Sequence, residues 1–417
     1  MGSLETTPSY YGWRVAVAAH FGLLLGFALY ACTFSVFLKP LANSFGWTRQ
    51  TLASGFAFSA LAVAIFSPLI GWWLDRHSPR RFLIASILVF GCAFLAMGAL
   101  THSVWQFYAT CFVMGIVGNV IQMGYTQAIS SWFTYRRGTA LGLMLAGEGI
   151  GIILFPVAVE KLIGAAGWRV AYVSLGTLIL VLSLPLALLY AHSTLEPTEP
   201  ARIEQRTSGP VLASLRSYVF WIIVMVLFLT SISVNGALSQ QVPLLTDRGL
   251  TTAAAAFTVS VLGGTSLAGR LLTGWLLDRI QGAVLAFLLL LIASGGIFLL
   301  AHASTVGAGC AAALLLGLGA GGTSGTTPYL LTRHFGLRGF ATLYGLTWTF
   351  YAIAGGAGPI LLGRMFDRTG SYASTLVVLA AATALGSLLM LLLPAYRSAP
   401  VSSENLSIYP DLRLSKQ

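Results

Sequence analysis

The sequence predicts an all-helical protein that crosses a membrane twelve times, and three observations predict it. The 417 residues are 57% hydrophobic and only 8% charged, whereas soluble domains are about 25% charged. Apolar stretches of about 20 residues, long enough to span a bilayer, recur along the whole chain. A motif of the first half recurs in the second half, which indicates two similar bundles of six helices each.

The predicted spans divide into two sets of six, separated within each set by short polar or basic loops. The first set covers residues 14–38, 50–74, 81–101, 105–132, 138–162 and 169–191. The second set covers residues 217–242, 252–277, 282–302, 306–332, 338–364 and 371–395.

A polar stretch that contains glutamates, arginines and prolines separates the two sets. We interpret it as a linker between two domains. The expected organisation is an N-terminal bundle at 1–191, a cytoplasmic linker at 192–216, a C-terminal bundle at 217–395 and a cytoplasmic tail at 396–417.

The basic residues indicate the orientation. Roughly twice as many Lys and Arg fall on the N-terminal side of the spans as on the other side, which favours a cytoplasmic N-terminus. An even number of spans places both termini on that side, so we expect a cell-membrane protein with cytoplasmic termini. The net charge of +11 belongs to these loops, and it does not indicate a nucleic-acid partner.

Two loop motifs carry the internal repeat. Gly71-Trp-Trp-Leu-Asp75-Arg76 follows the second predicted span, and Gly274-Trp-Leu-Leu-Asp278-Arg279 follows the eighth, at an offset of 274 − 71 = 203 residues. Parallel repeats of this kind bind substrate near the bilayer midplane, between the halves. We predict conformational-switch loops that contain Gly71, Asp75, Arg76, Arg137, Gly274, Asp278 and Arg279.

One arginine lies deep inside the eighth predicted span. Arg270 precedes the charged end at Asp278 by 278 − 270 = 8 residues, which is about 12 Å of helix. A cation at that depth costs several kcal/mol and is by default a functional-site hypothesis. The alternatives are a structural ion pair or a side chain that snorkels to the interface.

The motifs resemble those of a known superfamily. The run from Gly71 to Arg81 resembles the cytoplasmic loop motif of the major facilitator superfamily. Within that superfamily, Trp132 to Gly151 is similar to the signature of the monocarboxylate transporter family and the neighbouring oxalate/formate antiporters. Tyr11-Gly12-Trp13 resembles the entry to that family's first span, and Gly358 to Asp367 resembles the end of its eleventh.

The resemblance assigns Arg270 a role. The family carries an arginine in its eighth span, followed four residues later by glycine, as Arg270 is by Gly274. That arginine is taken to bind the substrate carboxylate, and a planar guanidinium matches a carboxylate with two parallel donors. Ser266 stands where the family has an acid, and the family's first-span lysine has no equivalent in residues 29–33.

Glu148 is our candidate for the missing acid. It lies at about the same depth in the fifth span as Arg270 does in the eighth, and these two helices face each other in the superfamily. We hypothesise that an arriving anion competes for Arg270 while Glu148 takes a proton. A permanent pair that braces the halves, or a glutamate facing a water-filled vestibule, is the alternative.

The remaining candidates for substrate contact are polar or aromatic residues within spans, each of which could equally pack or hydrogen-bond between helices. Residues 346–351 carry no lysine, so a single deep cation favours a monoanion. These candidates are Tyr30, Asn119, Gln122, Tyr125, Tyr329, Trp348 and Tyr351.

The predicted function is secondary active transport of small monocarboxylates such as lactate or pyruvate, in symport with a proton, by alternating access. The sequence has no phosphate-binding Gly-x-x-x-x-Gly-Lys loop and no metal-ligand spacing, so we expect no enzyme activity, no cofactor and no metal. We expect a monomer in a lipid bilayer. Carboxylate exchange and a carboxylate sensor that does not transport remain as alternatives.

Overall fold

The computed structural model describes residues 5, 7, 10–100, 103–191 and 209–395, and their regular elements are all helical. The N-terminal elements are α1 (Tyr11–Leu24), α2 (Phe27–Phe45), α3 (Arg49–Leu74), α4 (Pro79–Gly98), α5 (Val104–Trp132), α6 (Arg137–Leu178), the π-helical turn η1 (Ile179–Ser183) and α7 (Leu184–Tyr190). The C-terminal elements are α9 (Gly209–Leu215), α10 (Tyr218–Asp247), α11 (Thr252–Leu277), α12 (Gly282–His302), α13 (Val306–Thr323), α14 (Thr326–Phe335), α15 (Phe340–Thr369) and α16 (Ala373–Met390).

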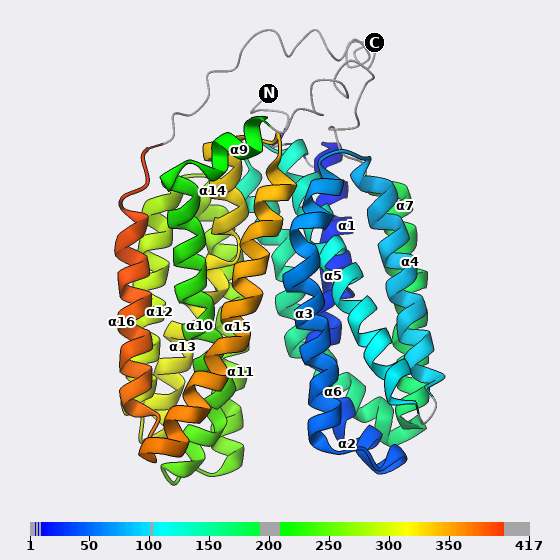
Figure 1. Cartoon of the computed structure of the whole chain (residues 1–417), viewed down its shortest axis with the longest axis vertical. Coiled ribbons are helices and arrows are strands. Elements are labelled where there is room, and N and C mark those ends of the chain that lie inside the picture. Colours follow the sequence, from blue (N-terminus) through cyan, green and yellow to red (C-terminus); the bar gives the residue numbers. More distant parts are fainter. Residues whose placement is uncertain (1–4, 6, 8–9, 101–102, 192–208, 396–417) are drawn as a thin grey trace, which may run out of the picture.

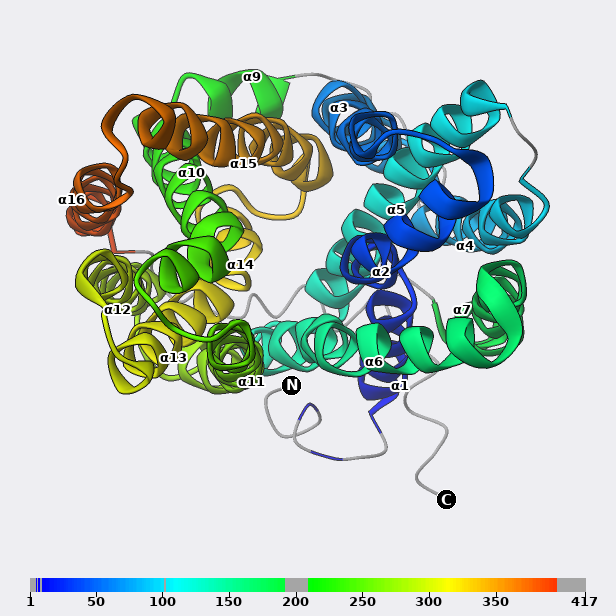
Figure 2. The same ribbon diagram turned by 90° about the horizontal axis from the view of Figure 1, so that it is seen from below.

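The helices form two groups that stand side by side. Figure 1 shows α9–α16 on the left and α1–α7 on the right, and the view along the helices in Figure 2 separates the same two groups. The groups meet where α3 packs on α15 and where α6 packs on α11. We call the end of the molecule where α1 begins and α16 ends the terminal end.

Eleven continuous runs among the described residues are long and apolar enough to cross a membrane. One of them, Arg137–Tyr190, has 54 residues, or about 80 Å of helix, which is enough for two crossings of a core about 30 Å thick. Gly167 interrupts it with a φ of 85°, a conformation that glycine adopts without steric cost. Residues 138–162 and 169–191 are therefore separate spans, and the expected total of twelve agrees with the fold.

Two predicted spans are broken helices. The span at 14–38 consists of α1 and α2, with Gly26 between them at a non-helical ψ of −143°. A Cβ at Gly26 would lie 2.5 Å from the carbonyl oxygen of Gly22, so a larger residue would not fit this break. The span at 306–332 is divided into α13 and α14 by Ser324 and Gly325, which both keep right-handed helical φ and ψ values.

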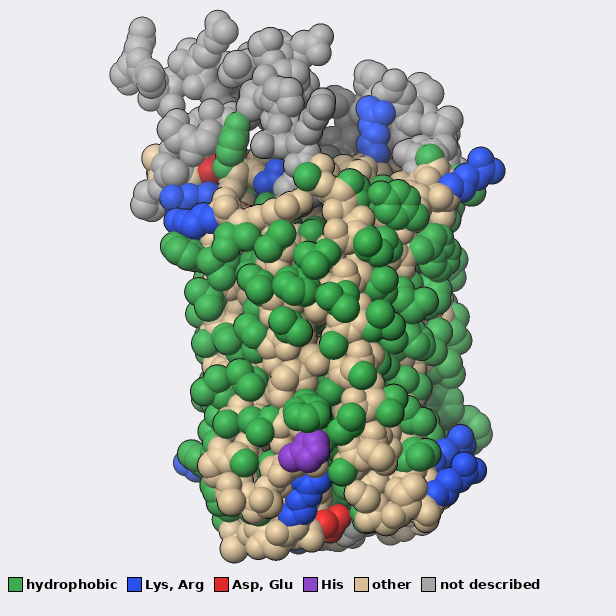
Figure 3. Space-filling view, turned by 90° about the vertical axis from the view of Figure 1, so that its left-hand side faces the viewer, with side chains coloured by type: hydrophobic (Ala, Val, Ile, Leu, Met, Phe, Trp, Pro, Cys, Tyr) green, Lys and Arg blue, Asp and Glu red, His purple; other side chains and the backbone are tan. Residues whose placement is uncertain are grey.

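The outer surface suits a bilayer. Figure 3 shows a face covered by hydrophobic side chains over most of its height, with arginines and lysines gathered near the two ends. Large apolar residues such as Leu69, Val181 and Val378 are exposed on the protein. The predicted linker is described only from residue 209, where α9 begins, and the predicted tail at 396–417 lies outside the described residues.

Candidate functional site

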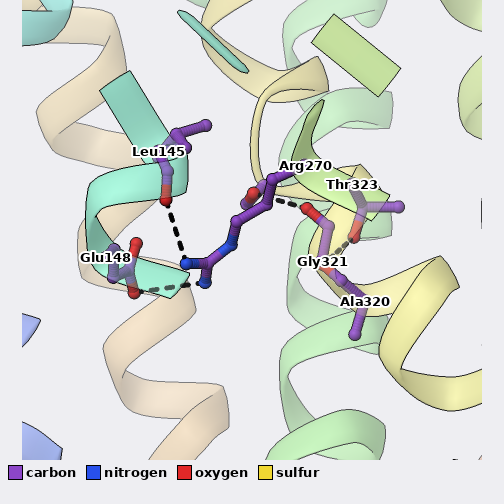
Figure 4. Close-up of polar contacts among 7 residues, drawn as sticks. Leu145, Glu148, Arg270, Ala320, Gly321 and Thr323 are labelled. Atoms are coloured by element: carbon purple, nitrogen blue, oxygen red, sulfur yellow. Dashed lines mark hydrogen bonds and ion pairs between the residues drawn. The ribbon is translucent and has the colours of Figure 1, made fainter. Parts of the chain in front are cut away.

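A single ion pair joins the two groups of helices in the described part of the chain. Arg270 of α11 places its Nη2 atom 3.4 Å from Oε1 of Glu148 on α6. Its Nη1 atom donates a hydrogen bond of 3.1 Å to the carbonyl oxygen of Leu145, one turn earlier on α6. Figure 4 shows the arginine reaching across from its own helix to both partners.

Close packing of small residues between α6 and α11 lets the Arg270 side chain reach Glu148 and Leu145. A Cβ at Gly142 of α6 would lie 2.9 Å from the carbonyl oxygen of Arg270 and 2.9 Å from Cα of Gly274. The backbones of α6 and α11 therefore touch directly, one to two turns from the ion pair. Gly274, predicted from the loop motif, makes the reciprocal contact with Gly138 and Gly142.

The guanidinium of Arg270 is buried but incompletely bonded. The side chain is 8% exposed, and its Nε is buried with no hydrogen-bond partner in the described part of the chain. An unsatisfied buried donor costs about 1–3 kcal/mol, more where it is charged. Nε and Nη2 form one edge of the guanidinium fork, the arrangement that binds a carboxylate with two parallel hydrogen bonds.

Glu148 is the more accessible partner. Its side chain is 30% exposed, although it lies well inside a membrane-spanning helix. Cys32 on α2 and Tyr344 and Tyr351 on α15 lie within range of its charge. The pair itself is formed by α6 and α11.

The predicted contact residues on α15 lie beside the pair. Tyr351 lies within range of the charges of Glu148 and Arg270, and Trp348 packs edge-on against Tyr351 with ring centroids 5.1 Å apart. Gln122 of α5 lies near the Tyr344 side chain. Trp348, Tyr351 and Gln122 therefore belong to the region around the charge pair.

Three other predicted contacts lie inside the N-terminal helices. Asn119 donates from Nδ2 to Oγ of Ser67 at 2.6 Å, and Tyr30 is 2% exposed with its hydroxyl 3.4 Å from Oγ of Ser59. Tyr125 is fully buried, with its ring against Gly22. Asn119 and Tyr125 thus pack α5 against α3 and α1, and Tyr30 packs α2 against α3.

Tyr329 lies nearer the terminal end. Its hydroxyl donates to the carbonyl oxygen of Leu277 at 2.7 Å and accepts a bond of 3.1 Å from Nη2 of Arg333. The same Nη2 donates to the carbonyl oxygen of Thr134 at 3.0 Å, across the two groups. Tyr329 thus supports a contact between the groups instead of lining the charge pair.

The two predicted loop aspartates occupy equivalent positions. Asp75, after α3, accepts hydrogen bonds from the backbone amides of Ala341 and Thr342 at 3.0 and 2.7 Å and from the Thr342 hydroxyl at 2.6 Å. These groups belong to the first turn of α15, where free N–H groups and the helix dipole favour an anion.

Asp278, after α11, repeats the arrangement at the first turn of α6. It accepts from the amides of Gly138 and Thr139 at 2.7 and 2.8 Å and from the Thr139 hydroxyl at 2.5 Å. Burial raises the pKa of Asp75 to about 6 and also raises that of Asp278, because desolvation outweighs these hydrogen bonds.

The loop arginines do not reach across the groups in the same way. Arg76 lies over the ring of Trp72 at 4.1 Å, and Arg279 lies over Trp275 at 3.7 Å. Arg137 is 7% exposed and donates to the carbonyl oxygens of Phe133 and Ser130 in its own group. A Cβ at Gly71 would overlap the backbone of Ala341, so this glycine permits the contact between α3 and α15.

The sequence did not indicate Tyr344, Glu5, Thr139 or Thr342. The two threonines donate hydrogen bonds to the carboxylates of Asp278 and Asp75. The spacing of Tyr344, Trp348 and Tyr351 at i, i+4 and i+7 places them on one helix face and could have indicated Tyr344. Glu5 accepts hydrogen bonds from the amides of residues 134–136, a contact over about 130 positions that no local pattern indicates. Among the described residues, no group of three or more His, Cys, Asp or Glu could hold a metal ion.

The comparisons with known proteins agree on one family. The profile of the Major Facilitator Superfamily matches residues 16–359. Monocarboxylate transporter 13 of Rattus norvegicus is 27% identical over 403 residues, which cover 93% of this chain and 90% of that protein. An MFS-type transporter of Gibberella moniliformis is 26% identical over 372 residues, covering 86% and 84%.

Solved structures agree in fold. The proton:xylose symporter XylE matches with a TM-score of 0.75 at 16% identity, covering 95% of this chain and 98% of that one. The transporter FucP, in the outward conformation, matches with a TM-score of 0.72 at 15% identity, covering 92% and 99%.

Proposed function

Because the chain belongs to the Major Facilitator Superfamily, we propose that this transporter moves small monocarboxylates such as lactate or pyruvate, together with a proton. Relatives named monocarboxylate transporters, which match over nine-tenths of the chain, support the substrate class. The proposed site lies between the two bundles, at residues 1–191 and 217–395, with Arg270 at its centre.

The observation that carries the proposal is the half-bonded guanidinium of Arg270. Its Nε is buried without a hydrogen-bond partner in the described part of the chain, and its contact with Glu148 is a single one at 3.4 Å. A substrate carboxylate on the Nε–Nη2 edge satisfies Nε and replaces that contact with two parallel bonds. Gln122, Trp348 and Tyr351 then surround the rest of the substrate.

Charge balance provides the coupling to protons. The free site holds one positive and one negative charge, which offset each other. A bound monoanion would leave a net negative charge among helices, where an unpaired ion costs several kcal/mol. Protonation of Glu148 restores neutrality, so substrate and proton bind together and cross together.

The two aspartates provide the proposed switch. Asp75 and Asp278 each hold the first turn of a helix in the opposite group, at the terminal end. Breaking both contacts lets the groups rock and open that end, which is alternating access by a monomer. We place this end, with both termini, in the cytoplasm.

Uptake into vesicles tests the proposal. Reconstituted protein is given labelled lactate under an inward proton gradient, as wild type and as Arg270→Lys. Lysine keeps the charge but loses the planar fork, so we expect uptake to fall at least tenfold, while Arg14→Lys, on the exposed face of α1, leaves it unchanged. Equal uptake by wild type and Arg270→Lys would reject the carboxylate clamp.

Carboxylate exchange is the second candidate, because Ser266 and residues 29–33 lack the acid and the lysine of the family pattern. Exchange requires unlabelled carboxylate inside the vesicle and is indifferent to the proton gradient. Uptake into empty vesicles that stops when the gradient collapses favours symport over exchange.

A further inference from the structure

Glu5, which precedes α1, is bound to the loop between α5 and α6. Its side chain is 5% exposed, and its Oε1 atom accepts a hydrogen bond of 3.0 Å from the amide of Thr134. Its Oε2 atom accepts from the amides of Tyr135 and Arg136 at 3.0 and 2.8 Å. Three consecutive N–H groups therefore converge on one carboxylate, an arrangement of the backbone that favours an anion.

Aromatic packing holds Glu5 against this loop. Nε1 of Trp13 donates to the carbonyl oxygen of Glu5 at 3.0 Å, and the Trp13 ring packs edge-on against Phe133 with ring centroids 4.9 Å apart. The hydroxyl of Tyr10 donates to the carbonyl oxygen of Trp132 at 2.6 Å. Glu5, the start of α1 and the end of α5 therefore form one packed unit.

Arg333 of the opposite group binds the same loop. Its Nη2 atom donates to the carbonyl oxygen of Thr134 at 3.0 Å. This carbonyl and the N–H of Tyr135 belong to one peptide group, and in a planar trans peptide they point in opposite directions. The peptide therefore donates to the carboxylate of Glu5 on one side and accepts from the guanidinium of Arg333 on the other.

The two bonds of this peptide support each other. Each involves a charged group, and such bonds are stronger than neutral ones. A bond at one end of a peptide polarises it and strengthens the bond at the other end, by about 10–30%. Glu5 also fixes the direction in which the Thr134 carbonyl meets Arg333. It therefore strengthens a contact between the groups, although within the described residues its own hydrogen bonds all lie in one group.

We propose that Glu5 is a positioning residue for the closed terminal end, and that it acts through this one peptide on Arg333. Closure is supported at the same place by Asp278 of the opposite group, which binds the first turn of α6 directly after the loop. The proposal rests on the rocking motion of the proposed function. It adds that a residue outside the membrane-spanning helices takes part in the gate.

Distances between two spin labels test the proposal in the reconstituted full-length protein. Arg81 and Arg216 suit the labels, because they are exposed, lie next to the starts of α4 and α10 and belong to opposite groups. Glu5→Ala removes the acceptor of all three amides, so we expect the population with the terminal end open to rise about threefold or more. Glu5→Gln keeps an acceptor oxygen without the charge and should raise that population less.

Glu160→Ala is the matched control, because Glu160 is an exposed glutamate on α6. It should leave the label distances unchanged.

A double variant separates positioning from a general loss of stability. If Glu5 acts through Arg333, Glu5→Ala adds nothing to the opening that Arg333→Ala produces. A residue that merely stabilises the start of α1 would instead raise the open population by the same factor in both backgrounds.

Unchanged distances in Glu5→Ala, or an equal factor in the two backgrounds, would overturn the inference. Either result leaves the proposed rocking motion standing if Arg333→Ala still opens the terminal end. If Arg333→Ala also leaves the distances unchanged, the inference fails together with closure at this loop. Gradient-driven lactate uptake in the same vesicles tests the proposed transport separately.

Discussion

At the scale of single residues, the energetics of the site depend on two charges held far from either end of their helices. Removing one partner of a buried ion pair leaves the other uncompensated, at a cost of about 3–5 kcal/mol. The two partners differ in exposure, since the Glu148 side chain is 30% exposed and the Arg270 side chain 8%. The acid is therefore the partner that water reaches more easily.

Glu148→Gln should separate proton coupling from substrate binding. Glutamine does not ionise, so we expect the variant to bind lactate without pH dependence and to exchange it. Accumulation driven by a proton gradient should fall at least tenfold, because no proton moves with the substrate. Counterflow and gradient-driven uptake in the same vesicles measure the two activities.

Glu160→Gln is the control for this experiment, because Glu160 is an exposed glutamate on the same α6 helix. It should leave both activities intact. Full gradient-driven accumulation by Glu148→Gln would remove Glu148 from the proton pathway.

The sequence indicated these two residues by their depth, since charges in apolar spans are rare and costly, and by the family resemblance of the eighth span. It could not separate Gln122, Trp348 and Tyr351 from Asn119, Tyr125 and Tyr30. All six are polar or aromatic within spans, and only the rotation of each helix decides which of them face the gap between the groups.

At the scale of helices, the repeat has a direct structural expression. Each loop aspartate ends one helix and accepts hydrogen bonds from the first turn of a helix in the other group. The repeat in the sequence predicted two equivalent loops, but the partners are 266 and 140 positions away along the chain. The residues around each aspartate do not indicate partners at such a distance along the chain.

Asp75→Ala should weaken the closed terminal end. It leaves two backbone amides and the Thr342 hydroxyl without their acceptor, a loss of about 1–3 kcal/mol. We expect the population with the terminal end open to rise about tenfold or more. Distances between spin labels at Tyr135 and Arg338, in opposite groups, report this population.

Asp367→Ala is the control, because this exposed aspartate lies near the far end of the same α15 helix. It should leave the label distances unchanged. Identical distance distributions for Asp75→Ala and wild type would show that Asp75 does not hold the terminal end closed.

The raised pKa of Asp75 makes this contact sensitive to pH. The closed state holds the pKa at about 6, above the ordinary value of 3.8, and opening to water returns it toward that value. A proton therefore binds more tightly to the closed state, so lowering the pH favours closure. Between pH 7 and pH 5 we expect about a tenfold shift toward the closed terminal end.

The same spin labels, measured across that pH range, check the prediction. Asp75→Asn cannot titrate but keeps an acceptor oxygen, so the shift should shrink in this variant. A shift toward the open state on acidification would contradict the assignment.

At the scale of the molecule, the contacts between the two groups are distributed unevenly. Within the described residues, the hydrogen bonds and the ion pair that join the groups all lie in the half of each helix nearest the terminal end, from Asp75 and Asp278 down to Thr349 and Glu148. This arrangement is closed at the terminal end, and the proposed alternating access requires these contacts to break.

Tethering the terminal end should therefore stop transport. Thr134 and Arg333 lie in opposite groups and are joined by a hydrogen bond of 3.0 Å. In a protein free of native cysteines, a short cleavable crosslink between Thr134→Cys and Arg333→Cys should abolish uptake but retain lactate binding. Reductive cleavage should restore uptake, and unchanged uptake by the crosslinked protein would exclude rocking at this end.

Much of the whole fold was predictable, because bilayer thickness sets helix length and the loop repeat indicates two similar halves. The breaks at Gly26 and Gly167 were less predictable, because the apolar segments contain many glycines and nothing in the sequence singles out these two. Only helix packing decides which glycine bends the chain and which permits close contact.

Proton uptake on substrate binding tests the central claim most directly. Purified protein in weakly buffered detergent solution near neutral pH receives lactate, and a pH indicator counts the protons taken up per lactate bound. If the anion displaces Glu148 from Arg270 and Glu148 becomes protonated, the wild type takes up about one proton per lactate and Glu148→Gln takes up none. Lactate binding by the wild type without proton uptake would contradict the account.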